Sequence, residues 1–195
     1  VIDGGSETYI NEMTKKISKI FLECEVTGIK RTTENVTLRT KSFVHDYDRV
    51  IIATHSDQAL KLLENPTEQE AEILGSMKYS SNKVIVHTDE RLMPERKLAW
   101  ASWNYNLNAN EEKASLTYYM NLLQNLEVDR SIFVTLNDSG TIDPSKILAR
   151  REYEHPFYDS GMIASQKRHS EISGQNRTHF VGAYWGNGFH EDGVT

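Results

Sequence analysis

The sequence predicts a mixed α/β fold whose sheet is mainly antiparallel. Three observations support this prediction. A stretch with helical periodicity comes first, and three short stretches of alternating polarity follow it. Next comes the β-branched run at residues 50–53, which is typical of a strand buried on both faces. Further alternating segments lie between predicted helices in the rest of the chain. With 195 residues, the chain is long enough for one large domain or two small ones.

The first third of the chain predicts a helix, a meander and one core strand. Ser6 is the expected N-cap of an amphipathic helix whose apolar stripe consists of Tyr9, Ile10, Met13, Ile17, Ile20 and Phe21. Three antiparallel strands are expected around Val26 and Ile29, Val36 and Leu38, and Phe43 and Val44. The core strand 50–53 then ends at Thr54 and His55.

The remaining elements alternate between helices and strands. A short helix is expected at 56–63, and a second helix begins with the capping box formed by Thr67 and Glu70. A long helical segment is expected at 159–172. The predicted strands are 83–87, 98–105, 116–120, 132–136, 147–153 and 179–181, with a loop at 104–113.

Composition and charge exclude several classes of protein. The chain has 22 Lys and Arg against 28 Asp and Glu, a net charge of −6, so we expect no nucleic-acid partner. Its longest apolar runs are too short for a transmembrane segment. Cys24 is the only cysteine, and the seven histidines do not pair at helical spacing, so we expect neither a disulfide framework nor a metal site. No signal peptide is visible, and we expect a cytoplasmic protein.

The C-terminal segment 182–193 carries the clearest chemical signal. A strand leads into Gly186 and Gly188 and then into acidic residues, a pattern that suits binding of a phosphate or a polar heterocycle. The acidic residues also fit a simpler interpretation, in which they only favour a helix dipole. Tyr184, Trp185 and Phe189 interleave the glycines, and they either line an apolar cleft or cap the core.

Several longer stretches carry a family resemblance. Residues 182–194 (GAYWGNGFHEDGV), 47–60 (YDRVIIATHSDQAL), 100–105 (WASWNY) and 116–124 (LTYYMNLLQ) resemble the FAD-dependent flavin-containing amine oxidase superfamily. More narrowly, they are similar to a bacterial branch of predicted NAD/FAD-binding or amine oxidoreductase proteins. The resemblance extends over essentially the whole chain.

The resemblance implies the later half of an amine oxidase-like fold. Residues 1–65 would form part of the FAD-binding domain, residues 66–177 the substrate-binding domain, and residues 178–195 the C-terminal FAD-binding segment. No Gly-x-Gly-x-x-Gly fingerprint for the FAD pyrophosphate occurs in the sequence, and the chain begins at Val1. We therefore expect a fragment that lacks the first Rossmann unit, binds FAD weakly or not at all, and is inactive alone.

The resemblance also assigns candidate residues. The implied FAD contacts are Val26, Ala53, Thr54, Trp185, Gly186, Gly188, Phe189, His190, Glu191, Asp192 and Gly193. The aromatic residues Trp100, Trp103, Tyr105 and Tyr118 would suit an apolar substrate, although ordinary sheet packing also explains them. No motif identifies a catalytic residue, and we assign Lys83 to the surface.

Two functional hypotheses follow. In the first, the parent protein is an FAD-dependent oxidoreductase that oxidises a C–N or C–C bond of a small amine or lipid-like substrate by hydride transfer to the flavin. In the alternative, the chain is a non-catalytic module that binds a lipid or a protein partner. Because the core strand 50–53 would lack sheet neighbours, we also expect the chain to self-associate.

Overall fold

The computed structural model describes residues 6–106, 115–189 and 191–194, and the chain divides into two compact units. Unit 1 comprises Val1–Lys19 and Ser81–His155, and unit 2 comprises Ile20–Ser80 and Pro156–Thr195. We expected domain boundaries near residues 65 and 177. The compact units instead meet between residues 19 and 20, 80 and 81, and 155 and 156. The assignment of domains to FAD and substrate stays a prediction.

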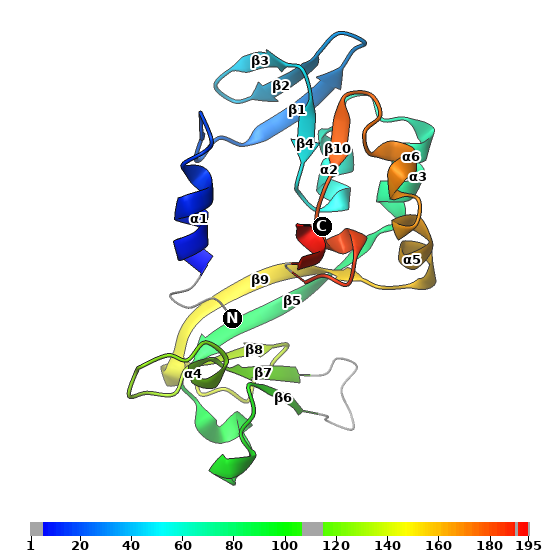
Figure 1. The fold of residues 1–195 in the computed structure, drawn as a ribbon. Coiled ribbons are helices and arrows are strands. Elements are labelled where there is room, and N and C mark those ends of the chain that lie inside the picture. Colours follow the sequence, from blue (N-terminus) through cyan, green and yellow to red (C-terminus); the bar gives the residue numbers. More distant parts are fainter. Residues whose placement is uncertain (1–5, 107–114, 190, 195) are drawn as a thin grey trace. The chain divides into compact units, whose positions relative to one another are not determined.

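Unit 2 begins with the expected meander. Strands β1 (Val26–Arg31), β2 (Val36–Thr40) and β3 (Val44–Tyr47) pair antiparallel in the order β1-β2-β3 (Figure 1). In the register, Ile29 faces Leu38 and Val36 faces Tyr47. The prediction of three antiparallel strands is confirmed.

The core strand has only one neighbour among the described residues. β4 (Val50–Ile52) pairs in parallel with β10 (Thr178–Phe180), and Figure 1 shows the two side by side. Val50 and Ile52 are buried, but Ile51 is 67% exposed. The expectation that this strand is buried on both faces is therefore wrong, because helices cover only the face that carries Val50 and Ile52.

Four α-helices lie in the described part of unit 2. They are α2 (Ser56–Leu62), α3 (Glu68–Ser76), α5 (Ser160–Gln166) and α6 (His169–Ile172). The capping box at α3 is present, since Thr67 Oγ1 accepts from the Glu70 amide and the Glu70 carboxylate accepts from the Thr67 amide. The helix expected at 159–172 is divided into α5 and α6, because Lys167 and Arg168 form a turn between them.

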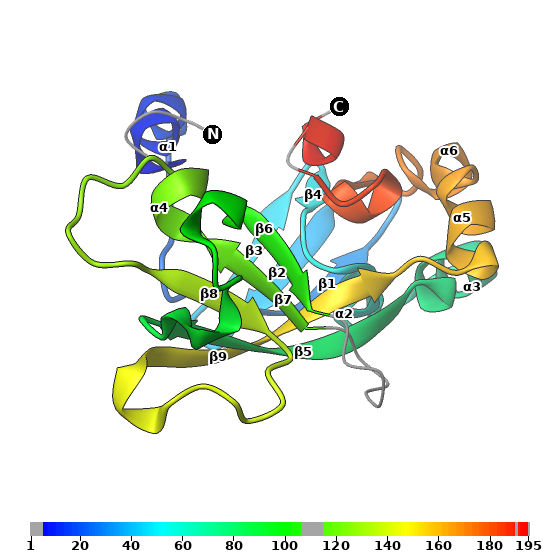
Figure 2. The same cartoon turned by 90° about the horizontal axis from the view of Figure 1, so that it is seen from below.

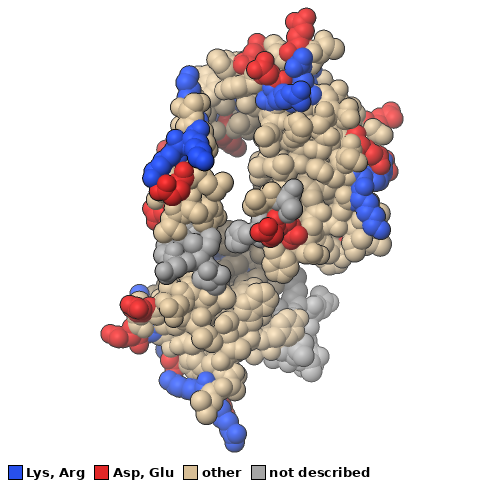
Figure 3. Space-filling model, in the orientation of Figure 1, with Lys and Arg blue, Asp and Glu red and all other residues tan. Residues whose placement is uncertain are grey.

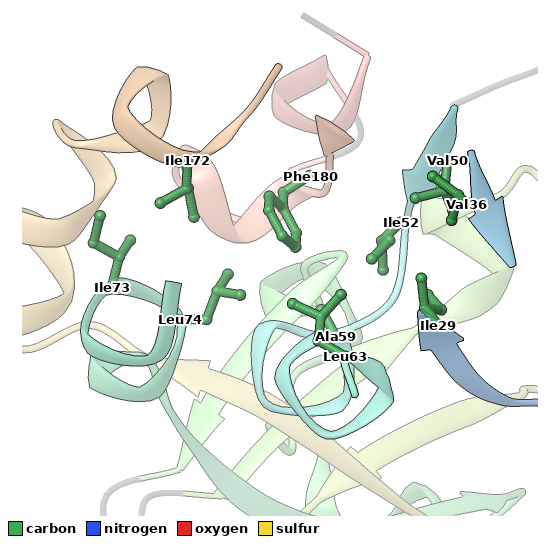
Figure 4. Packing of buried hydrophobic residues seen from close by; sticks show 10 residues of the cluster. All are labelled: Ile29, Val36, Val50, Ile52, Ala59, Leu63, Ile73, Leu74, Ile172 and Phe180. Carbon is green, nitrogen blue, oxygen red and sulfur yellow. The ribbon is translucent and has the colours of Figure 1, made fainter. Parts of the chain in front are cut away.

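The core of unit 2 is an apolar cluster formed by the meander, the β4–β10 pair and the helices (Figure 4). Phe180 lies at its centre with no exposed surface. Its ten buried members are Ile29, Val36, Val50, Ile52, Ala59, Leu63, Ile73, Leu74, Ile172 and Phe180.

Unit 1 is built on a five-stranded sheet of order β6-β7-β8-β5-β9, whose strands lie side by side in Figure 2. The strands are β5 (Lys78–His87), β6 (Trp103–Asn106), β7 (Ser115–Tyr119), β8 (Phe133–Leu136) and β9 (Ile147–Phe157). β5 and β9 contribute residues to both units. The strand expected at 98–105 begins only at Trp103, because Lys97–Ala99 forms a 3₁₀ helix.

Two short α-helices lie in the described part of unit 1. α1 (Ser6–Thr14) is shorter than its apolar stripe predicts, so Ile17, Ile20 and Phe21 lie beyond its end. Thr14 starts a turn, since its carbonyl accepts from the Ile17 amide. α4 (Met120–Leu123) follows β7.

The sheet of unit 1 alternates apolar and polar rungs across its strands. One rung joins Trp103, Tyr118, Val134 and Val86, and another joins Tyr105, Leu116, Leu136 and Val84. The rung between them, formed by Asn104, Thr117, Thr135 and Ile85, points to the other face and is buried. Trp103 is 57% exposed and Tyr105 is 62% exposed. This sheet therefore buries its polar rung and leaves much of its apolar face open.

The charged surface is mixed in sign. Figure 3 shows acidic and basic side chains in small groups, with uncharged surface between them. Within the described ranges, no helix is long and apolar enough to cross a membrane.

Candidate cofactor and substrate sites

The C-terminal loop lies where the two parallel strands of unit 2 end. The Val181 amide donates to the Ile52 carbonyl at 3.0 Å, so the chain leaves β10 beside the end of β4. The 3₁₀ helices Ala183–Trp185 and Glu191–Gly193 follow. In open α/β sheets, ligands bind outside the carboxyl ends of parallel strands. The fold thus brings the predicted loop and the predicted residues Ala53 and Thr54 to the same edge, with both of these residues exposed.

A single side chain from α5 fixes the path of this loop. Gln166 Nε2 donates to the carbonyls of Tyr184 at 2.9 Å and Gly186 at 2.6 Å. The Gly188 amide donates to the Ala183 carbonyl at 3.1 Å, and the Phe189 amide donates to Asp192 Oδ2 at 2.9 Å. These bonds hold the loop backbone in one conformation before any ligand binds.

Two glycines are required by the shape of the loop. Gly188 has a φ of +88°, and a Cβ there would lie 2.7 Å from the Tyr158 hydroxyl oxygen. A Cβ on Gly186 would lie 2.6 Å from Asp192 Cγ. The two positions therefore exclude any larger residue and let the backbone approach its neighbours closely.

Aromatic and polar groups surround the loop. Tyr184 is buried, and Trp185 lies between it and His169, with ring centroids 5.2 Å and 4.5 Å away. Burial raises the pKa of the Tyr184 phenol well above its usual range, and Tyr79 adds to this rise. The Tyr184 hydroxyl, Trp185 Nε1 and His55 Nδ1 are buried without a hydrogen-bond partner among the described residues. Such unpaired buried groups are costly and need an explanation.

The end of β4 carries a second aromatic group. His55 stacks on Tyr79 with ring centroids 4.4 Å apart, and the Ser56 amide donates to the Tyr79 hydroxyl at 2.8 Å. Tyr158 lies against Gly188, and burial raises the pKa of its phenol, with Asp192 and Tyr79 contributing.

Sequence reasoning missed Gln166, His55, Tyr79 and Tyr158. A signal existed only for His55, which directly follows the predicted core strand. The other three come from separate segments that only the tertiary fold brings to the loop.

The predicted FAD contacts fall into three groups. Trp185, Gly186, Gly188, Phe189, Glu191, Asp192 and Gly193 lie in the loop described above, and Ala53 and Thr54 lie at the strand edge. The side chain of Val26 packs against the apolar cluster of unit 2. His190 lies outside the described residues.

The predicted substrate aromatics lie on both faces of the sheet in unit 1. Trp103 and Tyr118 are paired across strands with ring centroids 5.4 Å apart, and Tyr105 lies on the same face. Trp100 lies on the other face, where it contacts the rings of Tyr119 and Phe133. Only three of the four residues therefore form one surface.

The face opposite these aromatics contains a buried hydrogen-bonded chain. His87 Nδ1 accepts from the Asp89 amide at 3.1 Å, so Nε2 carries the hydrogen and donates to Thr135 Oγ1 at 2.7 Å. Thr135 Oγ1 in turn lies 2.8 Å from Thr117 Oγ1. All three side chains are fully buried. His87 is therefore a neutral structural group, closed to any substrate in this structure.

The part of the chain that the structure describes contains no candidate metal site. No group of three or more His, Cys, Asp or Glu side chains there could hold a metal ion.

A glycine loop at the carboxyl ends of parallel strands, in a chain that also carries a large antiparallel sheet, is typical of α/β proteins that bind a nucleotide cofactor. The family model for flavin containing amine oxidoreductase matches residues 1–132. The chain belongs to this family. No curated protein matches the sequence.

Solved structures share the fold at low identity. Putrescine oxidase bound to putrescine matches with a TM-score of 0.63 and 15% identity, over 98% of this chain and 50% of that one. Cyclohexylamine oxidase from Brevibacterium oxydans matches with a TM-score of 0.63 and 12% identity, over 97% and 50%. A fatty acid isomerase from P. acnes that produces CLA matches with a TM-score of 0.62 and 11% identity, over 97% and 49%. The chain spans about half the length of these structures.

The family implies a flavin, and the residues at the loop fit such a group. The glycines bring the backbone close to its neighbours. The Tyr184 hydroxyl, Trp185 Nε1 and His55 Nδ1 are buried at this edge without a hydrogen-bond partner among the described residues.

Proposed function

We propose that this chain works as part of an FAD-dependent oxidoreductase that oxidises a C–N or C–C bond of a small amine or lipid-like molecule. The observation that carries the proposal is the glycine loop, fixed by Gln166 at the carboxyl ends of β4 and β10. FAD, when bound, would accept the hydride that leaves the substrate carbon.

In this proposal the loop binds and orients the cofactor. The Gln166 amide holds the loop in shape, so little ordering is required when the cofactor arrives. The buried Tyr184 hydroxyl has no hydrogen-bond partner among the described residues, so it can donate a hydrogen bond to the cofactor. Ala53 and Thr54 would contact the cofactor from the end of β4.

The apolar face of the sheet in unit 1 would receive the substrate. Across β6, β7, β8 and β5, its two outward rungs contain Trp103, Tyr105 and Tyr118 together with aliphatic residues, and no charged side chain. A face of this kind binds the hydrocarbon part of a molecule by burial of apolar surface. The eight side chains of these two rungs include no carboxylate for an ammonium group, which favours a substrate with a large apolar body.

A second candidate function rests on the same face. A non-catalytic module that binds a lipid or a protein partner would also use exposed aromatics such as Trp103 and Tyr105. The absence of a Gly-x-Gly-x-x-Gly fingerprint from the sequence favours this alternative for the chain taken alone.

One experiment separates the two candidates. The full-length protein that contains this chain is purified and reconstituted with FAD, and its flavin absorbance is followed anaerobically while amines or fatty acids are added. The oxidoreductase proposal expects a yellow protein that one of these classes bleaches. A colourless protein after reconstitution would contradict it and leave the binding module. Residues 1–195 alone are expected to bind FAD weakly or not at all.

A further inference from the structure

A pocket of about 610 Å³ lies at the other end of the parallel strand pair in unit 2. Four chain segments form it: the end of β1 with its turn, the residue before β4, the link between α2 and α3, and the turn before β10. Its volume is typical of small-molecule sites. The lining residues are Arg31, Thr32, Thr33, Arg49, Asn65, Thr67, Gly174, Asn176 and Arg177.

This pocket is separate from the proposed cofactor loop. Arg49 directly precedes β4 and Arg177 directly precedes β10, so both lie where the strands begin. The cofactor loop and Ala53 follow the ends of the same strands. Three-residue strands place the two sites roughly 10 Å apart along the strand direction.

The lining of the pocket is cationic. It holds three arginines and no acidic residue, in a protein of net charge −6. Arg31 is buried and paired with Glu70, whose carboxylate compensates its charge. Within the described ranges, neither Arg49 nor Arg177 forms an ion pair with a carboxylate. Two positive charges therefore lack compensation at the pocket.

Donor groups are held in place there. Arg177 donates from Nε and Nη2 to the Thr33 carbonyl, at 3.0 and 2.8 Å, and from Nη1 to the Asp48 carbonyl at 3.2 Å. These bonds use three of its five N–H groups and leave two for a ligand. Arg31 Nε is buried without a partner among the described residues, although its two other nitrogens are bonded. An acceptor in the pocket would satisfy this donor.

The turn before β10 is strained in a way that fixes Arg177. Asn176 and Arg177 both adopt left-handed backbone conformations, with φ of 47° and 60°. Two consecutive non-glycine residues in this region are uncommon, and such strain is concentrated at functional sites. It holds the arginine at the pocket at a cost in backbone energy.

We propose that this pocket binds a phosphate or diphosphate group of a small molecule, separately from the flavin. Arginine side chains match the geometry of phosphate oxygens, and the threonine hydroxyls and asparagine amides add uncharged donors. The lining contains no aromatic ring on which a nucleobase could stack. The ligand is therefore recognised by its phosphate group and not by a base.

Titration of FAD-free chain tests this proposal. Inorganic pyrophosphate is added at low ionic strength, where screening is weak, and backbone amide resonances are followed by NMR. The proposal expects saturable shifts in residues 31–33, 49, 65–67 and 174–177. Parallel titrations with inorganic phosphate and ribose 5-phosphate distinguish a free anion from an ester as the preferred source. Shifts spread over all lysines and arginines, or none that saturate, would overturn the proposal.

A matched pair of variants separates direct contact with the ligand from long-range electrostatic attraction by the whole protein. Arg49→Gln removes an exposed lining charge and is expected to raise the Kd for pyrophosphate about tenfold. Lys30→Gln removes the same charge from an exposed position of β1 that does not line the pocket, and is expected to change Kd less than about twofold. Equal weakening by both variants would overturn a built site.

A competition experiment with FAD tests whether the two sites are separate. If FAD added to the chain saturated with pyrophosphate displaced it from these amides, the pocket and the cofactor loop would not be separate sites, and this inference would fail. Because the titration needs no flavin, the oxidoreductase proposal can fail without affecting its outcome.

Discussion

The strands of the two units differ in the side chains that they bury and expose. Unit 2 encloses ten apolar residues between its meander, its parallel strand pair and its helices. The sheet of unit 1 buries His87, Thr117 and Thr135 and leaves Trp103 and Tyr105 more than half exposed. The exposed aromatic residues of unit 1 belong to the face that we propose for the substrate, whereas the apolar cluster of unit 2 packs its strands against its helices.

The largest expected effect tests the buried ion pair of unit 2. Arg31→Met would leave Glu70 as an unpaired charge with 1% of its surface exposed, and is expected to cost about 3–5 kcal/mol. Urea unfolding, followed by the fluorescence of Trp185 after Trp100 and Trp103 are changed to Phe, reports on unit 2.

A double variant provides the control for this pair. Arg31→Met combined with Glu70→Leu removes both charges and should recover most of the lost stability. A single variant that loses less than about 1 kcal/mol would contradict the assignment of Glu70 as a buried ion.

The buried hydrogen bonds among His87, Thr135 and Thr117 in unit 1 are expected to be the next most sensitive feature. Thr135→Val keeps the shape of the side chain but leaves the buried Nε2–H of His87 without its acceptor, at a cost of about 1–3 kcal/mol. Val134→Thr, one residue away on the outward face, is expected to cost under about 1 kcal/mol. Chemical denaturation of both variants measures the difference, and equal costs would show that the two faces are not energetically distinct.

The cofactor loop depends on Gln166. Gln166→Leu removes the donor from the carbonyls of Tyr184 and Gly186, with an expected loss of about 1–2 kcal/mol in the local stability of the loop. Hydrogen exchange at the Gly186 and Gly188 amides should become faster. Gln175→Leu, an exposed glutamine of the same unit, should leave both rates unchanged. Unchanged exchange in the Gln166 variant would show that the loop is held by other contacts.

The pH dependence of stability tests the neutral state of His87. Burial lowers its pKa in the folded chain, and this effect is larger than the opposite effects of Asp89 and Asp138. The unfolded chain, with a histidine pKa of about 6.5, therefore takes up this proton first. The contribution of His87 is complete above pH ~6.5 and falls as the pH drops below it, by at most about 1.4 kcal/mol per pH unit.

Two substitutions check this assignment. His87→Gln should flatten the dependence between pH ~5 and ~6.5, whereas His155→Gln, at an exposed position of the same unit, should not. An unchanged slope in the His87 variant would place the titrating group elsewhere.

The smallest expected effect concerns self-association. β4 has β10 as its only partner among the described residues, and Ile51 is largely exposed, so the strand can pair with a second copy. Analytical ultracentrifugation should show an oligomer that Ile51→Lys weakens. A clean monomer at micromolar concentration would contradict this prediction.

Local patterns in the sequence predicted the elements that depend on near neighbours. The alternation around Val26, Val36 and Val44 predicted the meander, and the pair Thr67 and Glu70 predicted the start of α3. The family predicted from motifs along the chain is also confirmed, by a family model that matches residues 1–132. These features are determined within a few residues of one another or within a single long motif.

Features that depend on register or on distant segments could not be predicted. Periodicity placed Trp100 in one strand with Trp103, but the 3₁₀ helix Lys97–Ala99 turns it to the other face. The hydrogen bond between His87 and Thr135 depends on the pairing of β5 with β8, and Gln166 reaches the loop only through the packing of α5. The cationic pocket gathers four separate segments, and no local pattern marks it.

The alternation of rungs in unit 1 has a consequence for how such a protein can change over time. Residues that would contact a ligand, such as Tyr105 and Tyr118, are immediate chain neighbours of Asn104 and Thr117, which stabilise the fold. Exposed side chains on the outward rungs, such as Trp103 and Tyr105, can therefore be exchanged for larger or smaller ones at little cost in stability, so the proposed substrate face can change on a constant scaffold. A one-residue insertion in β7 would instead exchange the two faces and destroy both properties at once.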